Sequence, residues 1–215
     1  MKEISELASN LRNEYLKRTL SEADVSTDPI EQFGAWFKEA LDAEIHNANA
    51  MTLATATPDG HPSVRIVLLK GMDKDGFVFF TNYHSRKGLA IARNINVAVN
   101  FFWKELERQV CVEGVVEKIT AEESDEYFGS RPEGSKLSAW ASPQSMPVKR
   151  EELEDAMRKM QIEFKDKEIQ RPPHWGGYRL KPHRIEFWQG RPNRLHDRIL
   201  YTYKDGNWAI SRLAP

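Results

Sequence analysis

The sequence predicts a mainly β fold with flanking helices, closed as an antiparallel barrel. Strand-like runs follow one another along most of the 215 residues, short turns such as Asp73-Lys74-Asp75-Gly76 join them, and few helical runs stand between them. Strands joined by tight turns pair antiparallel, and many of them with helices packed outside favour a barrel. Because the chain has no internal repeat and no linker, we expect residues 27–215 to form one domain behind a mobile segment, residues 1–26.

The first clear helix begins at Asp28. Asp28 is suited to cap this helix, Pro29 suits its first turn, and Glu31 stands where a capping box needs an acid. Apolar residues then recur at helical spacing, which predicts a face that packs on the core. That face carries Ile30, Phe33, Phe37 and Leu41.

Strand patterns begin near residue 51 and continue towards the C-terminus. Two early turns, Pro58-Asp59-Gly60 and residues 73–76, predict two successive hairpins of a meander. Thr120 opens a helix with a capping box that reaches Phe128. The predicted strands span 51–57, 64–70, 77–81, 96–103, 108–119, 183–189, 199–203 and 208–212, and the other predicted helices span 86–93 and 147–167.

The composition limits the function. The 31 basic and 32 acidic residues give a formal net charge of -1, which speaks against nucleic acid or an anionic membrane as a partner. Cys111 is the only cysteine, so an intramolecular disulfide and a Cys-based zinc site are excluded and a reducing cytoplasm is favoured. The N-terminus is too charged for a signal peptide, and no apolar run reaches the roughly 20 residues of a membrane span. The histidines are scattered and predict no metal site.

Any phosphate must be bound by side chains, because the sequence has neither a glycine-rich dinucleotide motif nor a P-loop. Arg65 and Lys70 stand at the two ends of an apolar strand run and are either phosphate ligands or rim residues. Arg86 and Lys87 stand at the start of a predicted helix. Two cations there oppose the helix dipole, which favours a bound anion over a bare basic turn.

Two further groups combine cations with other polar side chains. Tyr127, Arg131 and Ser135 recur every four residues, which would place two hydroxyls beside a guanidinium. The alternative is an arginine that merely favours a helix C-terminus. Residues 194–198 contain two arginines, a histidine and an aspartate after a strand pattern and a turn. Arginine presents a planar fork suited to phosphate or carboxylate, and the alternative is a solvated loop with an internal ion pair.

Eight segments carry a resemblance, in this order: Arg65–Lys70, Phe80-Thr81-Asn82, Ser85-Arg86-Lys87, Glu107-Arg108-Gln109, Tyr127–Pro132, Gln144-Ser145, Phe187–Gly190 and Arg194–Arg198. Together they resemble the pyridoxine (pyridoxamine) 5′-phosphate oxidase family over nearly the whole chain. The resemblance implies an FMN-binding split β-barrel that forms a homodimer. It implies oxidation of pyridoxine or pyridoxamine 5′-phosphate to pyridoxal 5′-phosphate by O2, which yields H2O2 and, from the amine, ammonia.

The resemblance assigns the phosphate end of FMN to Arg65, Arg86, Lys87 and Ser145, and the flavin ring to Gln109, Trp188 and Arg198. For the last three residues the alternatives are a glutamine that pairs strands, a core tryptophan and an ion-paired arginine. Gln109 can both donate and accept along the ring. Phe80 departs from relatives that have tyrosine there: the change has no effect if the residue contacts FMN through its backbone, and it removes one hydrogen bond if the contact is through the hydroxyl. We interpret Cys111 as a small buried apolar residue and not as a nucleophile, because the flavin performs the redox chemistry. The full set implied to bind FMN is Arg65, Ile66, Val67, Leu68, Leu69, Lys70, Phe80, Thr81, Arg86, Lys87, Gln109, Gln144, Ser145, Trp188 and Arg198.

The substrate set implied by the resemblance is Arg12, Tyr15, Lys70, Tyr127, Arg131, Ser135, Arg194 and His196. Arg194 and His196 are the catalytic candidates, placed on the substrate's ring and reacting substituent. His196, with an ordinary pKa of about 6.5, can accept a proton, and positioning of the substrate is the alternative. Arg12 and Tyr15 match positions that fold over substrate as a lid, and a frayed terminus is the alternative.

A second class of function competes with the oxidase. A flavin-binding or haem-handling split-barrel protein without phosphate-oxidase activity needs no second phosphate site. The set Tyr127, Arg131 and Ser135 therefore argues against it, as do Arg194 and His196. A nucleic-acid-binding barrel is disfavoured by the net charge and by the lack of interleaved basic and aromatic residues.

Overall fold

A computed structural model describes residues 4, 9 and 15–215 of the chain. They form two compact units, each mainly antiparallel β with helices, which confirms the predicted fold class. Both units combine segments that are distant in sequence, and the single domain expected over 27–215 stays a prediction. The terminal unit contains residues up to Ala48, Asn100–Cys111 and Arg184–Pro215, and the central unit contains Asn49–Val99 and Val112–His183.

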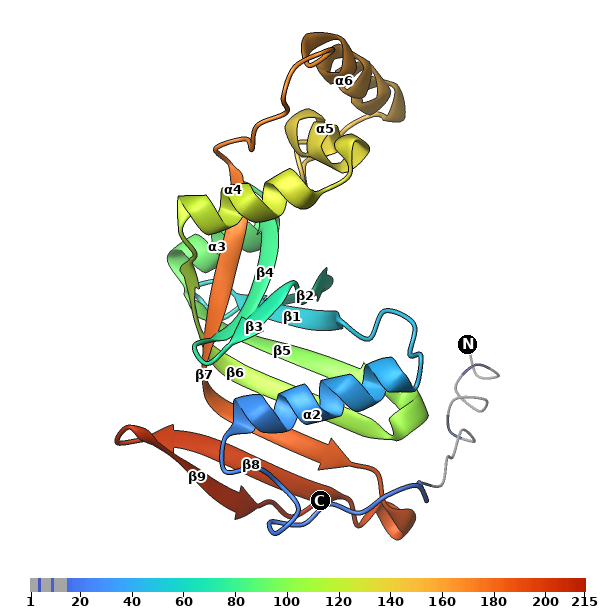
Figure 1. Cartoon of the computed structure of the whole chain (residues 1–215), viewed down its shortest axis with the longest axis vertical. Helices are drawn as coiled ribbons and strands as arrows, with labels where there is room; N and C mark the ends of the chain where they lie inside the picture. Colours follow the sequence, from blue (N-terminus) through green and yellow to red (C-terminus); the bar gives the residue numbers. More distant parts are fainter. Residues whose placement is uncertain (1–3, 5–8, 10–14) are drawn as a thin grey trace. The chain divides into compact units, whose positions relative to one another are not determined.

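The central unit contains the longer run of strands (Figure 1). Their order is β2-β1-β5-β6-β7-β4-β3. β1 pairs antiparallel with β2, with Ala50 opposite Leu68, and β4 pairs with the start of β7, with Phe77 opposite Leu180. The strands are β1 (Ala50–Ala56), β2 (Pro62–Leu68), β3 (Gly71–Asp73), β4 (Gly76–Asn82), β5 (Asn96–Trp103), β6 (Arg108–Lys118) and β7 (Trp175–Gln189), the last three being shared with the terminal unit.

The predicted meander is wrong at its second hairpin. The turn at 73–76 joins β4 to the short β3 and not to β2. The amide of Leu69 donates to the carbonyl of Asn49 (2.8 Å), whereas the next amide, that of Lys70, donates to the carbonyl of Val78 (2.8 Å). The chain therefore passes from β1 to β4 within two residues. The apolar run 64–70 continues through this switch, so the sequence gives no sign of it.

The helices of the central unit are α3 (Arg86–Arg93), α4 (Ala121–Ser130), α5 (Glu133–Ala141) and α6 (Arg150–Glu163), with α5 beside α6. The capping box predicted for α4 is present: Thr120 Oγ1 accepts from the Glu123 amide (3.1 Å), and Glu123 Oε2 accepts from the Thr120 amide (2.9 Å). In the described part of the chain, no helix is long and apolar enough to cross a membrane.

The terminal unit contains α2 (Pro29–Asp42), for which Asp28 accepts from the Ile30 amide (2.7 Å). The capping box predicted there is not formed, because Glu31 instead accepts from the Ser26 hydroxyl (2.9 Å). The predicted apolar face is also partly wrong, since Leu41 is 54% exposed. The face that enters the core carries Phe33, Trp36 and Ala40.

Aromatic rings from α2 and the strands form the core of the terminal unit. The rings of Phe33 and Phe101 lie 4.9 Å apart between centroids, those of Trp36 and Phe187 5.2 Å, and those of Phe187 and Tyr201 5.5 Å. Burial of each such side chain is worth about 1.5–3 kcal/mol. The unit is completed by β8 (Asp197–Lys204), β9 (Asn207–Arg212) and two short 3-10 turns, η1 (Lys104–Leu106) and η2 (Pro192–Arg194).

Gly76→Ala should destabilise the protein far more than Gly60→Ala. Both glycines have positive φ, +134° and +88°, which costs an L residue about 1–2 kcal/mol. A Cβ on Gly76 would also lie 2.0 Å from the Leu180 carbonyl oxygen, whereas nothing lies within 4 Å of one on Gly60. We expect urea titration to show a loss of unfolding free energy of about 1 kcal/mol for Gly60→Ala and roughly 3 kcal/mol or more for Gly76→Ala. Equal losses would contradict the close approach of β4 and β7.

Candidate active site

Three cations gather where α3 begins, and among the described residues none of them forms an ion pair with a carboxylate. The Arg65 guanidinium donates to Thr55 Oγ1 (2.8 Å) and Ser63 Oγ (2.6 Å), which are neutral acceptors. Burial, and then the charge of Arg86, lower the pKa of Arg65. The side chains of Arg65, Arg86 and Lys87 therefore repel one another without a compensating negative charge.

Lys87 also carries a positive charge that, across the described residues, is bonded only to neutral oxygens. Its Nζ donates to Thr81 Oγ1 (3.0 Å) and Gln144 Oε1 (2.9 Å). Burial, and then the charge of Arg65, lower the pKa of Lys87 to about 8. The structure thus brings together five residues of the predicted FMN set. Partly buried cations among neutral oxygens fit a bound anion such as a phosphate.

Ser85 fixes the start of α3. Its side chain is fully buried, and its hydroxyl accepts from the Gly88 amide (3.3 Å) and donates to the Asn82 carbonyl (2.7 Å). A Cβ on Gly88 would lie 2.2 Å from the Tyr83 carbonyl oxygen. Only glycine lets the first turn approach the end of β4 this closely, and this approach sets the position of Lys87.

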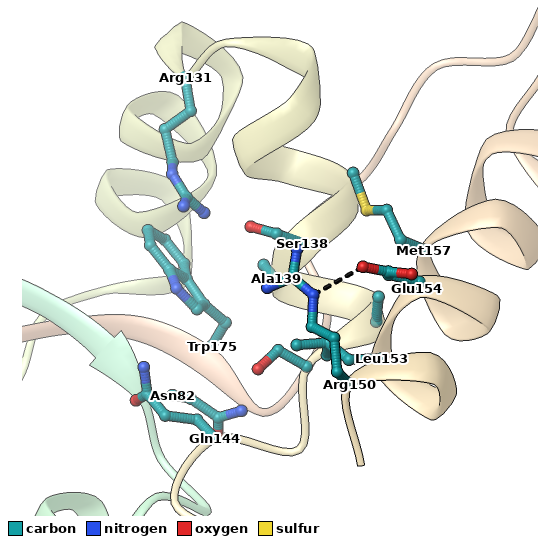
Figure 2. A pocket seen from close by; sticks show the side chains of 12 residues that line it. Asn82, Arg131, Ser138, Ala139, Gln144, Arg150, Leu153, Glu154, Met157 and Trp175 are labelled. Carbon is teal, nitrogen blue, oxygen red and sulfur yellow. Dashed lines mark hydrogen bonds and ion pairs between the residues drawn. The ribbon is translucent and has the colours of Figure 1, made fainter. Parts of the chain in front are cut away.

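Arg131 presents a second unpaired guanidinium. Its Cζ lies 4.5 Å from the ring centroid of Trp175 and 5.4 Å from that of Phe128. Its Nη1 is buried and has no hydrogen-bond partner, and burial lowers the pKa of Arg131. Figure 2 shows the guanidinium beside Trp175 on the wall of a cavity of about 410 Å³, opposite the Arg150–Glu154 pair. A buried donor of this kind is costly unless a ligand accepts from it.

The predicted substrate-phosphate set is spread over two cavities. Lys70 and Tyr127 line a second cavity of about 370 Å³, whereas Arg131 lines the first. Tyr127, Arg131 and Ser135 do not share one helical face, because α4 ends at Ser130 and Pro132 precedes α5. Proline disfavours helical backbone at the residue before it, and Arg131 is extended, with φ -73° and ψ 148°. Ser135 lies in the first turn of α5.

The ring of Phe80, an FMN candidate, contacts the substrate candidate Tyr127 and also Trp175, which belongs to neither set. It stacks on Tyr127 at 3.9 Å and on Trp175 at 5.4 Å between centroids. Nearby, Ser145 adopts a positive φ of 75°, which is uncommon outside glycine. Strain of this kind concentrates at binding sites.

The terminal unit contains the other candidates, and three of their rings meet. The Trp188 and His196 centroids lie 4.7 Å apart, and Tyr15 meets both edge-on, at 5.5 and 5.6 Å. Arg194 is exposed and has φ 60° beside Asn193 with φ 55°. Arg12 lies outside the described residues.

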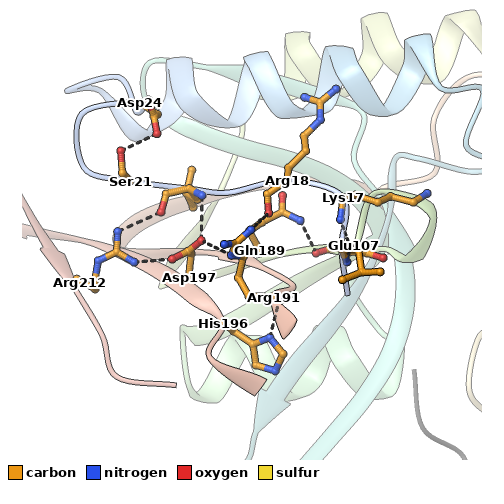
Figure 3. Close-up of polar contacts among 12 residues, drawn as sticks. Lys17, Arg18, Ser21, Asp24, Glu107, Gln189, Arg191, His196, Asp197 and Arg212 are labelled. Atoms are coloured by element: carbon orange, nitrogen blue, oxygen red, sulfur yellow. Dashed lines mark hydrogen bonds and ion pairs between the residues drawn. The ribbon is translucent and has the colours of Figure 1, made fainter. Parts of the chain in front are cut away.

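The ring of His196 has a defined hydrogen-bond partner (Figure 3). Its Nδ1 accepts from the Arg191 amide (3.1 Å), so Nδ1 carries no proton and the neutral ring is protonated at Nε2. Burial, and then the charge of Arg194, lower the pKa of His196, while Asp197 acts in the opposite direction. At neutral pH the free nitrogen of His196 is therefore a donor.

Arg198 is held by a carboxylate that sequence reasoning missed. Its Nε and Nη2 donate to Glu186 (2.7 and 3.0 Å), and its Nη1 donates to the Ala214 carbonyl (2.9 Å). Glu186 is 6% exposed and raises the pKa of Arg198. An acid in the apolar run around Trp188 was the available signal, since buried acids need a partner. Gln109, on β6, is half-buried, as is Cys111 two residues later.

Two known protein families match overlapping stretches of the chain. Residues 37–189 match the family described as pyridoxamine 5′-phosphate oxidase. Residues 175–215 match the pyridoxine 5′-phosphate oxidase C-terminal dimerisation region. The two matches together cover the chain from residue 37 to its C-terminus.

Individual relatives are similar over nearly their whole length. A pyridoxine/pyridoxamine 5′-phosphate oxidase of Cyanothece sp. is 54% identical over 208 residues, which cover 96% of this chain and 98% of the relative. The protein of the same name from Salinibacter ruber is 56% identical over 216 residues, 99% of this chain and 100% of the relative.

Solved structures share the fold. PhzG from Burkholderia lata 383, in complex with tetrahydrophenazine-1-carboxylic acid, superposes with a TM-score of 0.87 at 30% identity, covering 93% of this chain and 99% of that one. A pyridoxamine 5′-phosphate oxidase-related, FMN-binding protein from Nostoc punctiforme gives 0.68 at 18% identity, with coverages of 85% and 96%. These likenesses confirm the predicted split-barrel fold.

Sulfate should stabilise the ligand-free protein through the cluster around Lys87, and the effect should fade with rising pH. Because the pKa of Lys87 is lowered to about 8, its ammonium is present below that pH and lost above it. The gain in melting temperature over sodium chloride of equal ionic strength should therefore shrink between about pH 7 and 9. In Lys87→Met the gain should be smaller and constant with pH. A constant gain in the unaltered protein would contradict the lowered pKa.

Proposed function

The chain belongs to the pyridoxamine 5′-phosphate oxidase family, and we propose that it oxidises pyridoxine 5′-phosphate or pyridoxamine 5′-phosphate to pyridoxal 5′-phosphate. O2 accepts the electrons and becomes H2O2; with the amine substrate, water supplies the aldehyde oxygen and the nitrogen leaves as ammonia. One observation carries the assignment to this chain's own residues. Two separate cationic groups, the pair Arg65 and Lys87 and the single guanidinium of Arg131, are partly buried and have no carboxylate partner among the described residues. An enzyme that binds a phosphorylated cofactor and a phosphorylated substrate needs two such groups.

We propose FMN as the flavin. Its phosphate is bound by Arg65, Arg86 and Lys87, with Gln144 and the strained Ser145 at the same place. The support is the uncompensated charge at the start of α3, which fits a dianion. When bound, FMN takes up the hydride that leaves the substrate. The remaining residues proposed for this cofactor are Ile66, Val67, Leu68, Leu69, Lys70, Phe80 and Thr81, and on the ring side Gln109, Trp188 and Arg198.

The substrate phosphate is proposed to bind at Arg131, with Lys70, Tyr127 and Ser135. The unpartnered Nη1 of Arg131 supports this, because it offers a buried donor that no described side chain uses. The competing function, a flavin-binding split-barrel protein without phosphate-oxidase activity, leaves this donor unexplained. Lys70 and Tyr127 face a neighbouring cavity, so a shared phosphate requires these side chains to turn towards Arg131.

His196 is proposed to hold the substrate as a hydrogen-bond donor. Its Nε2 bears the proton while Nδ1 accepts from the Arg191 amide, so the ring offers a donor to the substrate's oxygen or nitrogen. A role as base would require the ring to give up the Arg191 bond. Arg194 and Tyr15 are proposed beside it on the substrate, where correct placement is worth large factors in rate.

The protein forms a homodimer, and its C-terminal residues 175–215 are the family's dimerisation region. We propose that each flavin draws on residues of both subunits, since the proposed FMN residues extend from Arg65 to Arg198. The proposed compartment is the cytoplasm, which a chain with a single cysteine suits.

Pyridoxamine 5′-phosphate should bleach the yellow flavin of the purified protein under anaerobic conditions, and Arg131→Ala should separate substrate binding from cofactor binding. A charge-assisted contact to phosphate is worth about 1.5–3 kcal/mol. The substrate concentration for half-maximal bleaching should thus rise about tenfold to a hundredfold in the variant, while the flavin content after dialysis stays unchanged. Loss of flavin with unaltered substrate affinity would assign Arg131 to the cofactor, and no bleaching of the unaltered protein would refute the activity.

His196→Gln should retain much of the rate of flavin reduction that His196→Ala loses. The glutamine amide nitrogen reaches about the place of Nε2 and can donate there. In anaerobic single-turnover mixing we expect His196→Gln within about tenfold of the unaltered protein and His196→Ala slower by roughly a hundredfold, both with full flavin content. Removal of a general base costs about 10²–10⁴-fold in rate, so equally severe losses in both variants would restore the role as base.

A further inference from the structure

A segment of the terminal unit, residues 15–20, is attached to the rest of that unit by its backbone. We call it the strap. Most of its hydrogen bonds run from its peptide groups to side chains far along the sequence, as Figure 3 shows. Because these bonds are made to the backbone of the strap, they fix its position without depending on the side chains of the strap itself.

Glu107 holds the first part of the strap. One carboxylate oxygen, Oε2, accepts from the amides of Leu16 (3.0 Å) and Lys17 (3.1 Å). Within the described part of the chain, Glu107 forms no ion pair, so these amides are its partners. Glu107 has φ 55°, and its carbonyl accepts from the Gly190 amide (2.8 Å). This left-handed residue is thus fixed against the turn that follows β7.

Asp197 holds the other end of the strap. Its Oδ2 accepts from the Leu20 amide (3.0 Å), and its Oδ1 accepts from Arg212 Nη1 (2.7 Å). Arg212 in turn donates to the Leu20 carbonyl (3.0 Å). Both polar groups of Leu20 are therefore bound by a pair of side chains that also bind each other. Asp197 directly follows His196, so the strap is tied to the polar run itself.

Tyr15 is the residue that this attachment places. Its ring meets Trp188 and His196 edge-on. A Cβ on Gly190 would lie 2.7 Å from Tyr15 Cγ, so only glycine leaves room for the ring at this depth. The ring occupies a fitted place beside the proposed catalytic histidine, and Tyr15 directly precedes Leu16 and Lys17, whose amides Glu107 binds.

We propose that Glu107 is a positioning residue for the substrate site: by binding the amides of Leu16 and Lys17 it keeps Tyr15 over Trp188 and His196. This rests on the proposed function, because the site it serves is the proposed substrate site. Asp197 is its counterpart at Leu20. Glu107 acts through Tyr15 and touches neither substrate nor flavin.

The test compares Glu107→Ala with Glu105→Ala, a nearby acid whose side chain has no such bond to the strap. Hydrogen exchange of the Leu16 and Lys17 amides in the resting holoenzyme should become at least about tenfold faster in Glu107→Ala. The KM for pyridoxine 5′-phosphate should rise about tenfold, with kcat within about twofold and flavin content unchanged. Glu107→Gln, which keeps an acceptor, should lie between. Glu105→Ala should match the unaltered protein in every measurement.

A double-mutant cycle with Tyr15→Ala separates this role from a general structural one. If Glu107 acts through Tyr15, Glu107→Ala should raise KM no further in the Tyr15→Ala background. Additive effects on KM, or unchanged exchange of the two amides in Glu107→Ala, would overturn the proposal. The exchange measurement does not depend on catalysis, so it tests the attachment even if the protein fails to oxidise pyridoxine 5′-phosphate and the proposed function falls.

Discussion

Uncompensated positive charge at the start of α3 is the constraint on which the central unit depends. Arg65 and Lys87 donate to hydroxyl, backbone and amide oxygens beside the exposed Arg86, and burial together with repulsion from a neighbouring cation lowers the pKa of Arg65 and Lys87. Folding such a cluster costs free energy, and a nearby carboxylate would offset that cost. Over the part of the chain that the structure describes, the fold places no carboxylate within ion-pair distance of the cluster. Binding of a phosphate therefore offsets the free energy that folding the cluster costs. The buried side chain of Ser85 and the close approach of Gly88 to the Tyr83 carbonyl fix the start of α3, and with it the position of the cluster.

Two arginines of the terminal unit differ from this cluster, because each forms an ion pair with a carboxylate. Arg198 is paired with the buried Glu186, and Arg108, whose side chain is 5% exposed, is paired with Glu39. Pairs of this kind add little net stability but fix orientation, because breaking one leaves a charge buried. A ligand anion is therefore expected at the unpaired cations of the central unit, while Arg108 and Arg198 serve to orient the groups around them. Arg198 is an example: because Glu186 balances its charge, it can lie beside the proposed flavin ring without adding an unpaired positive charge there.

Sequence reasoning succeeded where neighbouring residues decide the structure and failed where a distant contact does. The caps at Asp28 and Thr120 were predictable because their partners lie within three residues. The strand switch at Leu69 and Lys70 was not readable, because it depends on which strands lie on either side of them. The four-residue spacing of Tyr127, Arg131 and Ser135 suggested a shared face, yet Pro132 breaks the helix first, and this local rule should have outweighed the spacing.

The same reasoning explains why the resemblance predicts roles for many polar residues but none for Glu107 and Asp197. A phosphate ligand can be recognised by its type, since arginines and lysines without acidic neighbours point to an anion. A carboxylate that binds backbone amides has no such signature, because every residue except proline offers that donor. Its partner is defined by position alone. Residues of this kind can therefore be assigned only after folding has brought the strap, the turn after β7 and the ring of His196 together. Their influence on the site should appear in how firmly Tyr15 is placed and not in the chemical step itself.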